Sequence, residues 1–482
     1  MKRAALIMAG ISSLTLSACV AGPAPDIAAP APELPSSFAF APDPAAAATL
    51  DALLPANDPA FADLSARALA GAPTLLEAAA RIDAAIARSR GASANRMPSV
   101  IGDASVTGTR TNPSQFGAGL PAGIGIDTER VAYGANLAAV WDPDVFGRLR
   151  SQERAAARLA DAAGADAASI RIALISEIAG SVIDWRTVEA REAALSEDLV
   201  AAESLVALAD IRERAGIAPG FDRVRAETAA EASRTRIAAL ASEKARIIGR
   251  LTTLTAQSAQ TVRGSLAADA PPADAPAPPA SAPSNLLANR PDVQAAAARL
   301  AAADADLYAA AANRFPQFSL SAVLGLLAFD LGDLFDDDAV VGSVGGSLLA
   351  PLLDFGRIEA QIDGAAAGKR AAFQAYRGQV FTALGEAEAA YGLVAAADRE
   401  LAAAQRERAS AARAAELAEV RFRAGLSNFL TVLDARRAAD SSGERAAASR
   451  GRARRARVLL WQALGGDAGT AAGQAEILST SQ

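Results

Sequence analysis

Apolar positions in the second half of the chain follow a seven-residue period. The series consists of Phe373, Val380, Ala387, Val394 and Leu401, and Leu384 and Tyr391 occupy the adjoining seam with the same spacing. This heptad period predicts a long helix in a coiled coil, and the many alanines between these positions predict an unusually close packing of helices. In residues 103–109, by contrast, the period is two, with polar side chains on one face and small apolar ones on the other. Such alternation predicts a strand that faces lipid on one side and an aqueous lumen on the other.

Three further segments are typical of strands of the same kind. We expect them at residues 132–141, 317–328 and 340–349, with loops at 111–128 and 329–339 joining the strands in pairs. Each is close to the roughly 9–11 residues that cross a bilayer when tilted. Four strands cannot close a barrel, because the smallest membrane barrels have about eight, and open sheet edges are not tolerated in lipid. Several copies of the chain must therefore share one barrel, unless these strands are two soluble hairpins.

Much of the chain is an internal repeat, in which one sequence unit occurs twice. Three motifs recur in the same order: NR-x-P at 95–98 and 313–316, FGR at 146–148 and 355–357, and RAG at 214–216 and 423–425. The FGR and RAG glycines are 69 residues apart in both copies (216 − 147 and 425 − 356). A helix of that length spans roughly 100 Å at about 1.5 Å per residue. We expect each copy to contain a helix, a strand pair, a long helix, a tight turn and a returning helix.

The repeats and the linker between them give a domain plan. Six prolines within residues 271–283 exclude a helix there. The plan has six parts: a signal peptide (1–18), an acylated extended N-terminal segment (19–60), a first repeat (61–267), a proline-rich linker (268–284), a second repeat (285–466) and a C-terminal tail (467–482).

The N-terminus has the pattern of a secretory signal. Lys2 and Arg3 precede a short apolar segment that ends in LSAC at residues 16–19, which resembles the lipoprotein box of bacteria. The resemblance implies cleavage before Cys19, acylation of that residue, palmitate included, and sorting to the outer membrane, since no aspartate follows. An ordinary signal peptide with a chance cysteine is the alternative. No other charge-free apolar run of 18 residues occurs, so no transmembrane helix is expected.

The composition excludes most catalytic chemistry. The chain has no histidine and one cysteine, which removes histidine-based triads, histidine zinc sites, thiolate cages and intrachain disulfides. The formal charge of 47 − 54 = −7 argues against non-specific binding of nucleic acid. We therefore expect no enzyme activity, no cofactor, no metal site and no nucleic-acid partner.

The order and spacing of the motifs resemble those of TolC/NodT-type outer membrane factors, in their lipid-anchored branch. The similarity is carried by the segments RPDVQAAAARLAAADADL, NRFPQFSLSAVLG, LLDFGRIEAQ and RFRAGLSNFLTVLDARR. It implies a mixed α and β membrane protein that forms a homotrimer, with a 12-stranded β-barrel in outer membrane lipid and a periplasmic α-helical tunnel.

The resemblance also implies a function, that of the passive outer membrane channel of a tripartite efflux system. Its partners would be a periplasmic adaptor and an inner-membrane pump of the RND type. Two alternatives stay open: a duct for type I protein secretion, and a lipid-anchored periplasmic coiled-coil scaffold that transports nothing.

The same resemblance assigns candidate site residues. The tips at Ala215, Gly216 and Ile217, and at Ala424, Gly425 and Leu426, would contact the adaptor, although the glycines are also ordinary helix-ending residues. Leu430 and Asp434 would narrow the periplasmic aperture, with Asp434 in a three-fold acidic ring, although a carboxylate also suits the first turns of a helix. A family aspartate one turn earlier is Thr431 here. Asp222 matches a residue that holds the closed state, but its family partners correspond to Phe422 and Ser427, which puts that latch in doubt.

Overall fold

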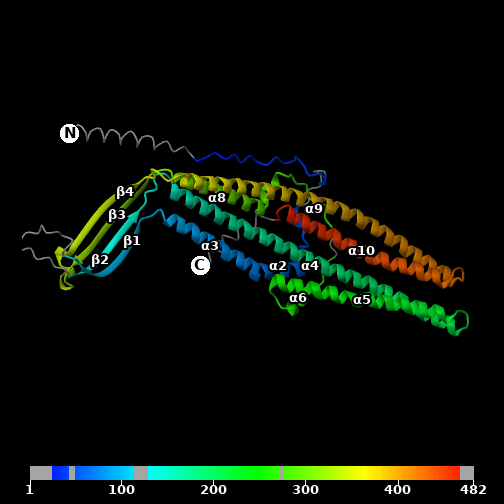
Figure 1. Ribbon diagram of the computed structural model, residues 1–482. Helices are drawn as coiled ribbons and strands as arrows, with labels where there is room; N and C mark the ends of the chain where they lie inside the picture. The colour runs from blue at the N-terminus through cyan, green and yellow to red at the C-terminus, as the bar shows by residue number, and fades with distance from the viewer. Residues whose placement is uncertain (1–23, 43–48, 113–128, 272–274, 467–482) are drawn as a thin grey trace, which may run out of the picture. The chain divides into compact units, whose positions relative to one another are not determined.

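The computed structural model describes residues 24–42, 49–112, 129–271 and 275–466 (Figure 1). The predicted signal peptide, the Cys19 anchor and the C-terminal tail therefore lie outside the described residues. The chain divides into two compact units. One consists of the described residues within 1–30, 83–162 and 297–375, and the other of those within 31–82, 163–296 and 376–482.

The first unit contains a four-stranded antiparallel sheet in the order β1-β2-β3-β4 (Figure 1). The strands are β1 (Ser99–Arg110), β2 (Glu129–Trp141), β3 (Gln317–Ala328) and β4 (Val340–Leu349). This confirms the predicted strands, and the bounds of β3 and β4 are the predicted ones. Every residue of the edge strands β1 and β4 is exposed in the single chain. Their outer edges are free to pair with strands of further copies, as closure of a barrel requires.

The FGR motifs mark the start of the two long helices, α4 (Arg148–Arg214) and α9 (Arg357–Arg423), which have 67 residues each. The Asp144 carboxylate accepts hydrogen bonds from the backbone N–H groups of Leu149 (2.8 Å) and Arg150 (2.7 Å). Asp354 does the same for Ile358 (2.8 Å), and these backbone donors lower the pKa of Asp354. Both carboxylates satisfy free donors at a helix N-terminus, which explains why the motif recurs with an aspartate before it.

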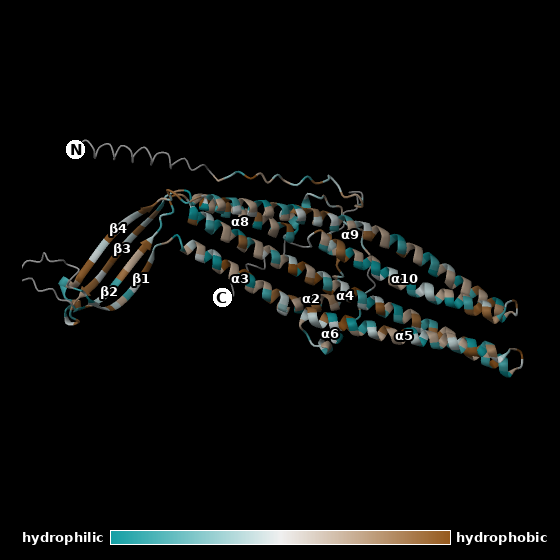
Figure 2. Ribbon diagram, in the orientation of Figure 1, coloured by the Kyte–Doolittle hydropathy of each residue, from teal (hydrophilic) through white to brown (hydrophobic). Residues whose placement is uncertain are grey.

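The second unit contains the returning helices α5 (Gly220–Thr255) and α10 (Phe429–Ala463) beside α4 and α9. Hydrophobic and hydrophilic residues mix along all four helices (Figure 2). Of the predicted heptad series in α9, the middle positions Val380, Ala387, Tyr391 and Val394 are buried, which confirms the coiled-coil seam.

The helices that precede the strand pairs, as predicted for each copy, are α3 (Pro73–Ala94) and α8 (Pro291–Ala312). The sequence did not predict α2 (Pro59–Gly71), α6 (Ala259–Leu266) or α7 (Asn285–Asn289). The N-terminal segment is also not extended throughout, because a 3₁₀ helix, η1, forms at Leu50–Leu53 and α2 begins at Pro59. A proline at the first position and the Asp58 side chain, which accepts a hydrogen bond from the Ala60 N–H group, favour the start of α2 there.

The proline-rich linker has no helix in its described residues, 268–271 and 275–284, as expected. It is nevertheless held against the helices. The Tyr391 hydroxyl donates a hydrogen bond to the Pro279 carbonyl (2.8 Å), and the Arg457 guanidinium donates to the Pro276 carbonyl (2.6 Å). Arg457 also pairs with Asp398 (2.9 Å), so its buried charge is compensated.

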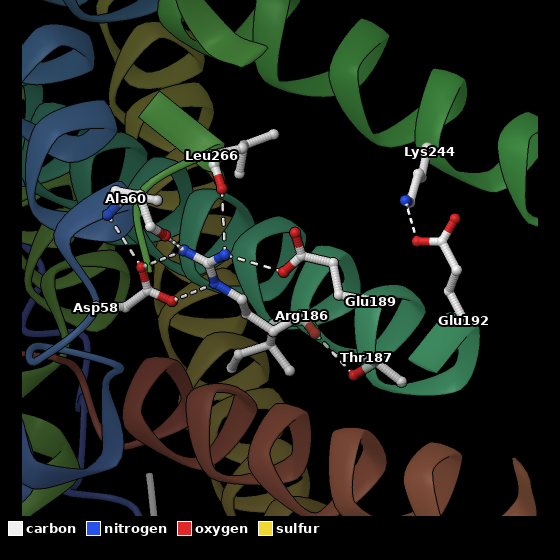
Figure 3. A network of polar contacts seen from close by, with 10 residues as sticks. Asp58, Ala60, Arg186, Thr187, Glu189, Glu192, Lys244 and Leu266 are labelled. Carbon is white, nitrogen blue, oxygen red and sulfur yellow. Dashed lines mark hydrogen bonds and ion pairs between the residues drawn. The ribbon is translucent and has the colours of Figure 1, made fainter. Parts of the chain in front are cut away.

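Arg186 of α4 ties the N-terminal segment to the helices (Figure 3). Its guanidinium donates to both oxygens of Asp58 (2.9 and 3.1 Å), to Glu189 (2.9 Å) and to the backbone carbonyls of Leu266 (3.1 Å) and Ala268 (2.7 Å). Asp58 and Arg186 are largely buried. The planar fork of an arginine can satisfy several such acceptors at once, which a lysine cannot.

Among the described helices, only α9 is long and apolar enough to cross a membrane, judged by length and composition. The mean hydropathy of its best 18-residue window is 1.2, and 33% of that window is buried. Alanine contributes much of this value. Since α9 runs over 67 residues with a buried seam, we interpret it as a coiled-coil helix.

Candidate functional site: the helical turns and the first turns of α5 and α10

The turns that join the long and the returning helices share one geometry. Gly216 and Gly425 have φ angles of +70° and +74°, in the left-handed region that favours glycine. In each turn the glycine N–H group bonds to the carbonyl three residues back, and the next N–H group bonds to the carbonyl five residues back. This is the Schellman motif, which ends a helix sharply. The apolar residues that follow, Ile217 and Leu426, are 65% and 69% exposed.

The two returning helices begin differently. In α10 the Asn428 side chain accepts hydrogen bonds from the backbone N–H and the hydroxyl group of Thr431, both at 2.9 Å. In α5 the capping residue is Pro219, which offers no side-chain hydrogen bond. Thr431 therefore has a local role in the helix cap, in the place of the family aspartate.

Leu430 and Asp434 lie one turn apart on α10 and are exposed in the single chain. The described residues provide no ion pair or side-chain hydrogen bond to Asp434. At the matching positions of the first repeat, 209 residues earlier, stand Phe221 and Arg225. The Arg225 guanidinium lies 4.8 Å from the centre of the Phe221 ring, a cation–π contact. The predicted acidic position thus has a basic counterpart on α5.

Phe422 packs in a small core that joins all four helices. Its ring centre lies 5.6 Å from that of Phe429, and the Arg212 guanidinium lies 4.8 Å from its ring. The Ser427 hydroxyl donates to the Ala418 carbonyl at 3.5 Å. Among the described residues, the Asp222 side chain has no ion pair or hydrogen bond. The structure thus gives Phe422 and Ser427 other contacts and does not pair either of them with Asp222.

An acid-rich groove lies between α4 and α5, next to the first turn, and was not predicted from the sequence. It has a volume of about 530 Å³ and is lined by Glu203, Val206, Ala207, Asp210, Glu213, Arg214, Arg223 and Glu227. Arg223 bridges Glu213 (2.8 Å) and Glu227 (2.5 Å), and these two hydrogen-bonded carboxylates raise the pKa of Arg223. Glu203 and Asp210 are seven residues apart, a heptad spacing that could have placed them on one face of α4.

The described residues contain no group of three or more His, Cys, Asp or Glu side chains that could hold a metal ion. The site consists of two exposed hairpin ends with a few charged side chains. Exposed apolar side chains beside charged ones suit contact with another protein.

Comparisons with known proteins match nearly the whole described chain. The model of the family described as outer membrane efflux protein matches residues 64–257 and 282–466. Outer membrane protein OprJ of Pseudomonas aeruginosa is 31% identical over 442 residues, which are 89% of either chain. The toluene efflux pump outer membrane protein TtgI of Pseudomonas putida is 29% identical over 417 residues, 85% of this chain and 86% of the relative.

Solved structures agree in fold. That of the outer-membrane channel OprN superposes with a TM-score of 0.81 at 28% identity, over 92% of this chain and 99% of the other. These matches confirm the predicted resemblance and the fold class, in which four strands per chain contribute to a trimeric barrel and the doubled helical hairpins form a tunnel. The chain belongs to the outer membrane efflux protein family.

Proposed function

We propose that this chain forms the passive duct through which an efflux system passes small molecules to the outside. The observation that carries the proposal is that one chain of the outer membrane efflux protein family combines two features. The first is a four-stranded sheet whose two outer edges are unpaired, and the second is a pair of long helical hairpins that end in the same kind of turn. Proteins of this family work as outer membrane channels with an adaptor and an inner-membrane pump. The relative named for a toluene efflux pump supports small molecules as cargo, rather than the proteins of a type I secretion system.

The experiment that tests this function is a clean deletion of the gene. Cells without the chain should retain more of several small hydrophobic dyes and regain efflux when the gene is restored, with no change in the proteins of the culture medium. Loss of a secreted protein without dye retention would support type I secretion. A chain that leaves membranes without detergent once its lipid is removed would support the non-transporting scaffold.

We propose that the two turns contact the periplasmic adaptor, and that the pump is of the RND type. The exposed Ile217 and Leu426 side chains and the acidic groove beside Glu213 support an interface with an adaptor helix that carries both apolar and basic residues. Neither turn is covered by the described part of its own chain, and the buried Phe422 core behind them keeps them in place.

Replacement of Asp434 tests the proposed aperture. Three Asp434 carboxylates near one axis should attract cations, so Asp434→Ala should raise single-channel conductance in planar bilayers and weaken selectivity for cations. Leu430→Ala should widen the opening with less effect on selectivity. Arg225→Ala is the control of opposite sign and should strengthen cation selectivity. If Asp434→Ala changes neither quantity, Asp434 is only a carboxylate near a helix start and the narrowest point lies elsewhere.

We also propose that Cys19 carries the lipid anchor, since it is the only cysteine and follows a signal-like apolar segment. Mass spectrometry of the mature protein should find an acylated N-terminal Cys19. Cys19→Ser should remove the lipid but leave a trimer that still requires detergent, because the strands span the membrane. An unmodified Cys19, or cleavage at another residue, would contradict the anchor.

A further inference from the structure

The interface between α4 and α10 is complementary along most of its length. Three side-chain contacts between the two helices join a donor to an acceptor: Ser176 to Gln462 (2.7 Å), Arg455 to Asp184 (2.9 Å) and Arg191 to Glu444 (2.7 Å). The next contact between these helices, closer to the turns, is different, because Asp198 of α4 lies opposite Asp440 of α10. Two groups of like charge thus face each other next to contacts that join a donor to an acceptor.

The surroundings of this acid pair favour a bound proton. The two carboxyl groups are half-buried, and each is close enough to affect the protonation of the other. The Oδ2 atom of Asp198 is inaccessible to water, and no N–H or O–H donor among the described residues reaches it. Two ionised carboxylates have only acceptors and cannot bond, whereas one shared proton makes a short, charge-assisted hydrogen bond.

The surrounding charges do not neutralise the pair. Arg236 of α5 and Arg436 of α10 face it, while Glu197 of α4 adds a further negative charge. Both arginines also form ion pairs with other carboxylates: Arg436 with Glu419 (2.6 Å) and Arg236 with Glu444 (4.0 Å). Burial, followed by the Asp440 charge, raises the pKa of Asp198 to about 7. Burial also raises the pKa of Asp440, against the lowering effects of Asp198 and the two arginines.

We propose that Asp198 and Asp440 form a proton-dependent lock that holds α10 on α4 while the pair shares a proton and loosens this contact when both are ionised. The consequence for transport rests on the proposed function, because Asp434 of the aperture lies six residues before Asp440 on the same helix. Loosening of α10 would then act directly on the turn of the helix that carries Asp434 and Leu430.

The sign of the pH effect follows from proton binding. The unfolded chain loses the Asp198 proton near the ordinary pKa of about 3.9, whereas the folded chain keeps it until about pH 7. Between these values the folded state binds more protons, so the stabilisation is complete at low pH and is lost as the pH rises through 7. We therefore expect a Tm that falls as the pH rises towards 7 and levels off above it, and a conductance that rises around pH 7 as the pair becomes ionised.

The test measures the detergent-solubilised trimer from pH 5 to 8.5, by thermal unfolding and by planar-bilayer conductance. Asp198→Asn supplies an amide that donates to the Asp440 carboxylate at every pH, so this pH dependence should disappear from both readouts. Asp440→Asn should remove it too. The matched control is Glu407→Gln, at the corresponding position of the second repeat (198 + 209 = 407), where Glu407 is exposed and already paired with Arg445. This variant should keep the wild-type transition.

Two results would overturn the lock. One is a wild-type trimer whose Tm does not fall between pH 5 and 7 and whose conductance does not rise around pH 7, and this does not depend on the folding of any variant. The other is an Asp198→Asn trimer that keeps the wild-type transition in both readouts. A trimer that conducts at no pH, even with Asp434→Ala, would contradict the proposed duct instead, while its melting profile would still decide the lock.

Discussion

Arg186→Ala should lower the free energy of unfolding by about 3–5 kcal/mol, the usual cost of removing one partner from a buried ion pair. The substitution leaves the Asp58 carboxylate without its guanidinium in a place that is only 9% exposed, and it leaves the carbonyls of Leu266 and Ala268 without this donor (Figure 3). Because Asp58 also caps α2, the helix and the chain after α6 should detach together from α4.

Thermal unfolding of the solubilised trimer, followed by circular dichroism, measures this effect. Arg186→Lys should recover only part of the Tm, since an ammonium group cannot reach all the acceptors that the guanidinium fork serves. The matched control is Arg234→Ala on α5, where Arg234 binds the exposed carboxylates of Glu203 and Glu231 in the open solvent. That variant should melt close to the wild type. Equal Tm values for Arg186→Ala and the wild type would contradict the role assigned to Arg186.

The elements that repeat along the chain were predictable. Period-two alternation gave four strands, and the 69-residue spacing of the glycines gave two long helices of equal length. These features depend on local periodicity and on glycines that end a helix, both of which are visible in a single sequence. The FGR motif was predictable as a landmark, but its role as a helix start needed the Asp144 and Asp354 hydrogen bonds.

The contacts that hold the non-repeated segments were not predictable. Asp58 and Arg186 are 128 residues apart, and Pro276 and Arg457 are 181 apart, with no periodicity that links them. Helix α6 has only eight residues and follows a long helix closely, so its pattern is too short to separate from its surroundings. Such segments are specified by tertiary contacts.

The candidate site was predictable only in part, for a different reason. The resemblance points to Asp434, and the repeat spacing to its counterpart Arg225, but what covers this face of α10 depends on other copies of the chain. The acid pair is also hidden from the sequence, since Asp198 and Asp440 each look like an ordinary solvated carboxylate of a helix until the two helices are placed together. Pairs between distant helices have no signature in either helix alone.

Gly451→Val should also destabilise the helical unit strongly, because glycine is the residue that lets α10 approach α4. A Cβ atom at position 451 would lie 2.1 Å from the Oγ1 atom and 2.7 Å from the Cγ2 atom of Thr187. The Thr187 hydroxyl is itself held by its bond to the Ile183 carbonyl (2.7 Å), and a β-branched side chain has few other rotamers in a helix. Overpacking of this kind costs about 1–3 kcal/mol, and valine adds two methyl groups to the clash.

The opposing effect is the gain in helix propensity, at most about 1 kcal/mol when a glycine is replaced by alanine in a helix interior. Gly443→Ala isolates that gain, because Gly443 lies on the same helix and an added methyl group would meet no described atom within 4 Å beyond its own stretch of helix. We therefore expect Gly443→Ala to raise the Tm of the trimer slightly, Gly451→Ala to lower it and Gly451→Val to lower it further. If Gly451→Val melts at or above the Gly443→Ala temperature, the close contact between α4 and α10 at Thr187 is not present in the assembled channel.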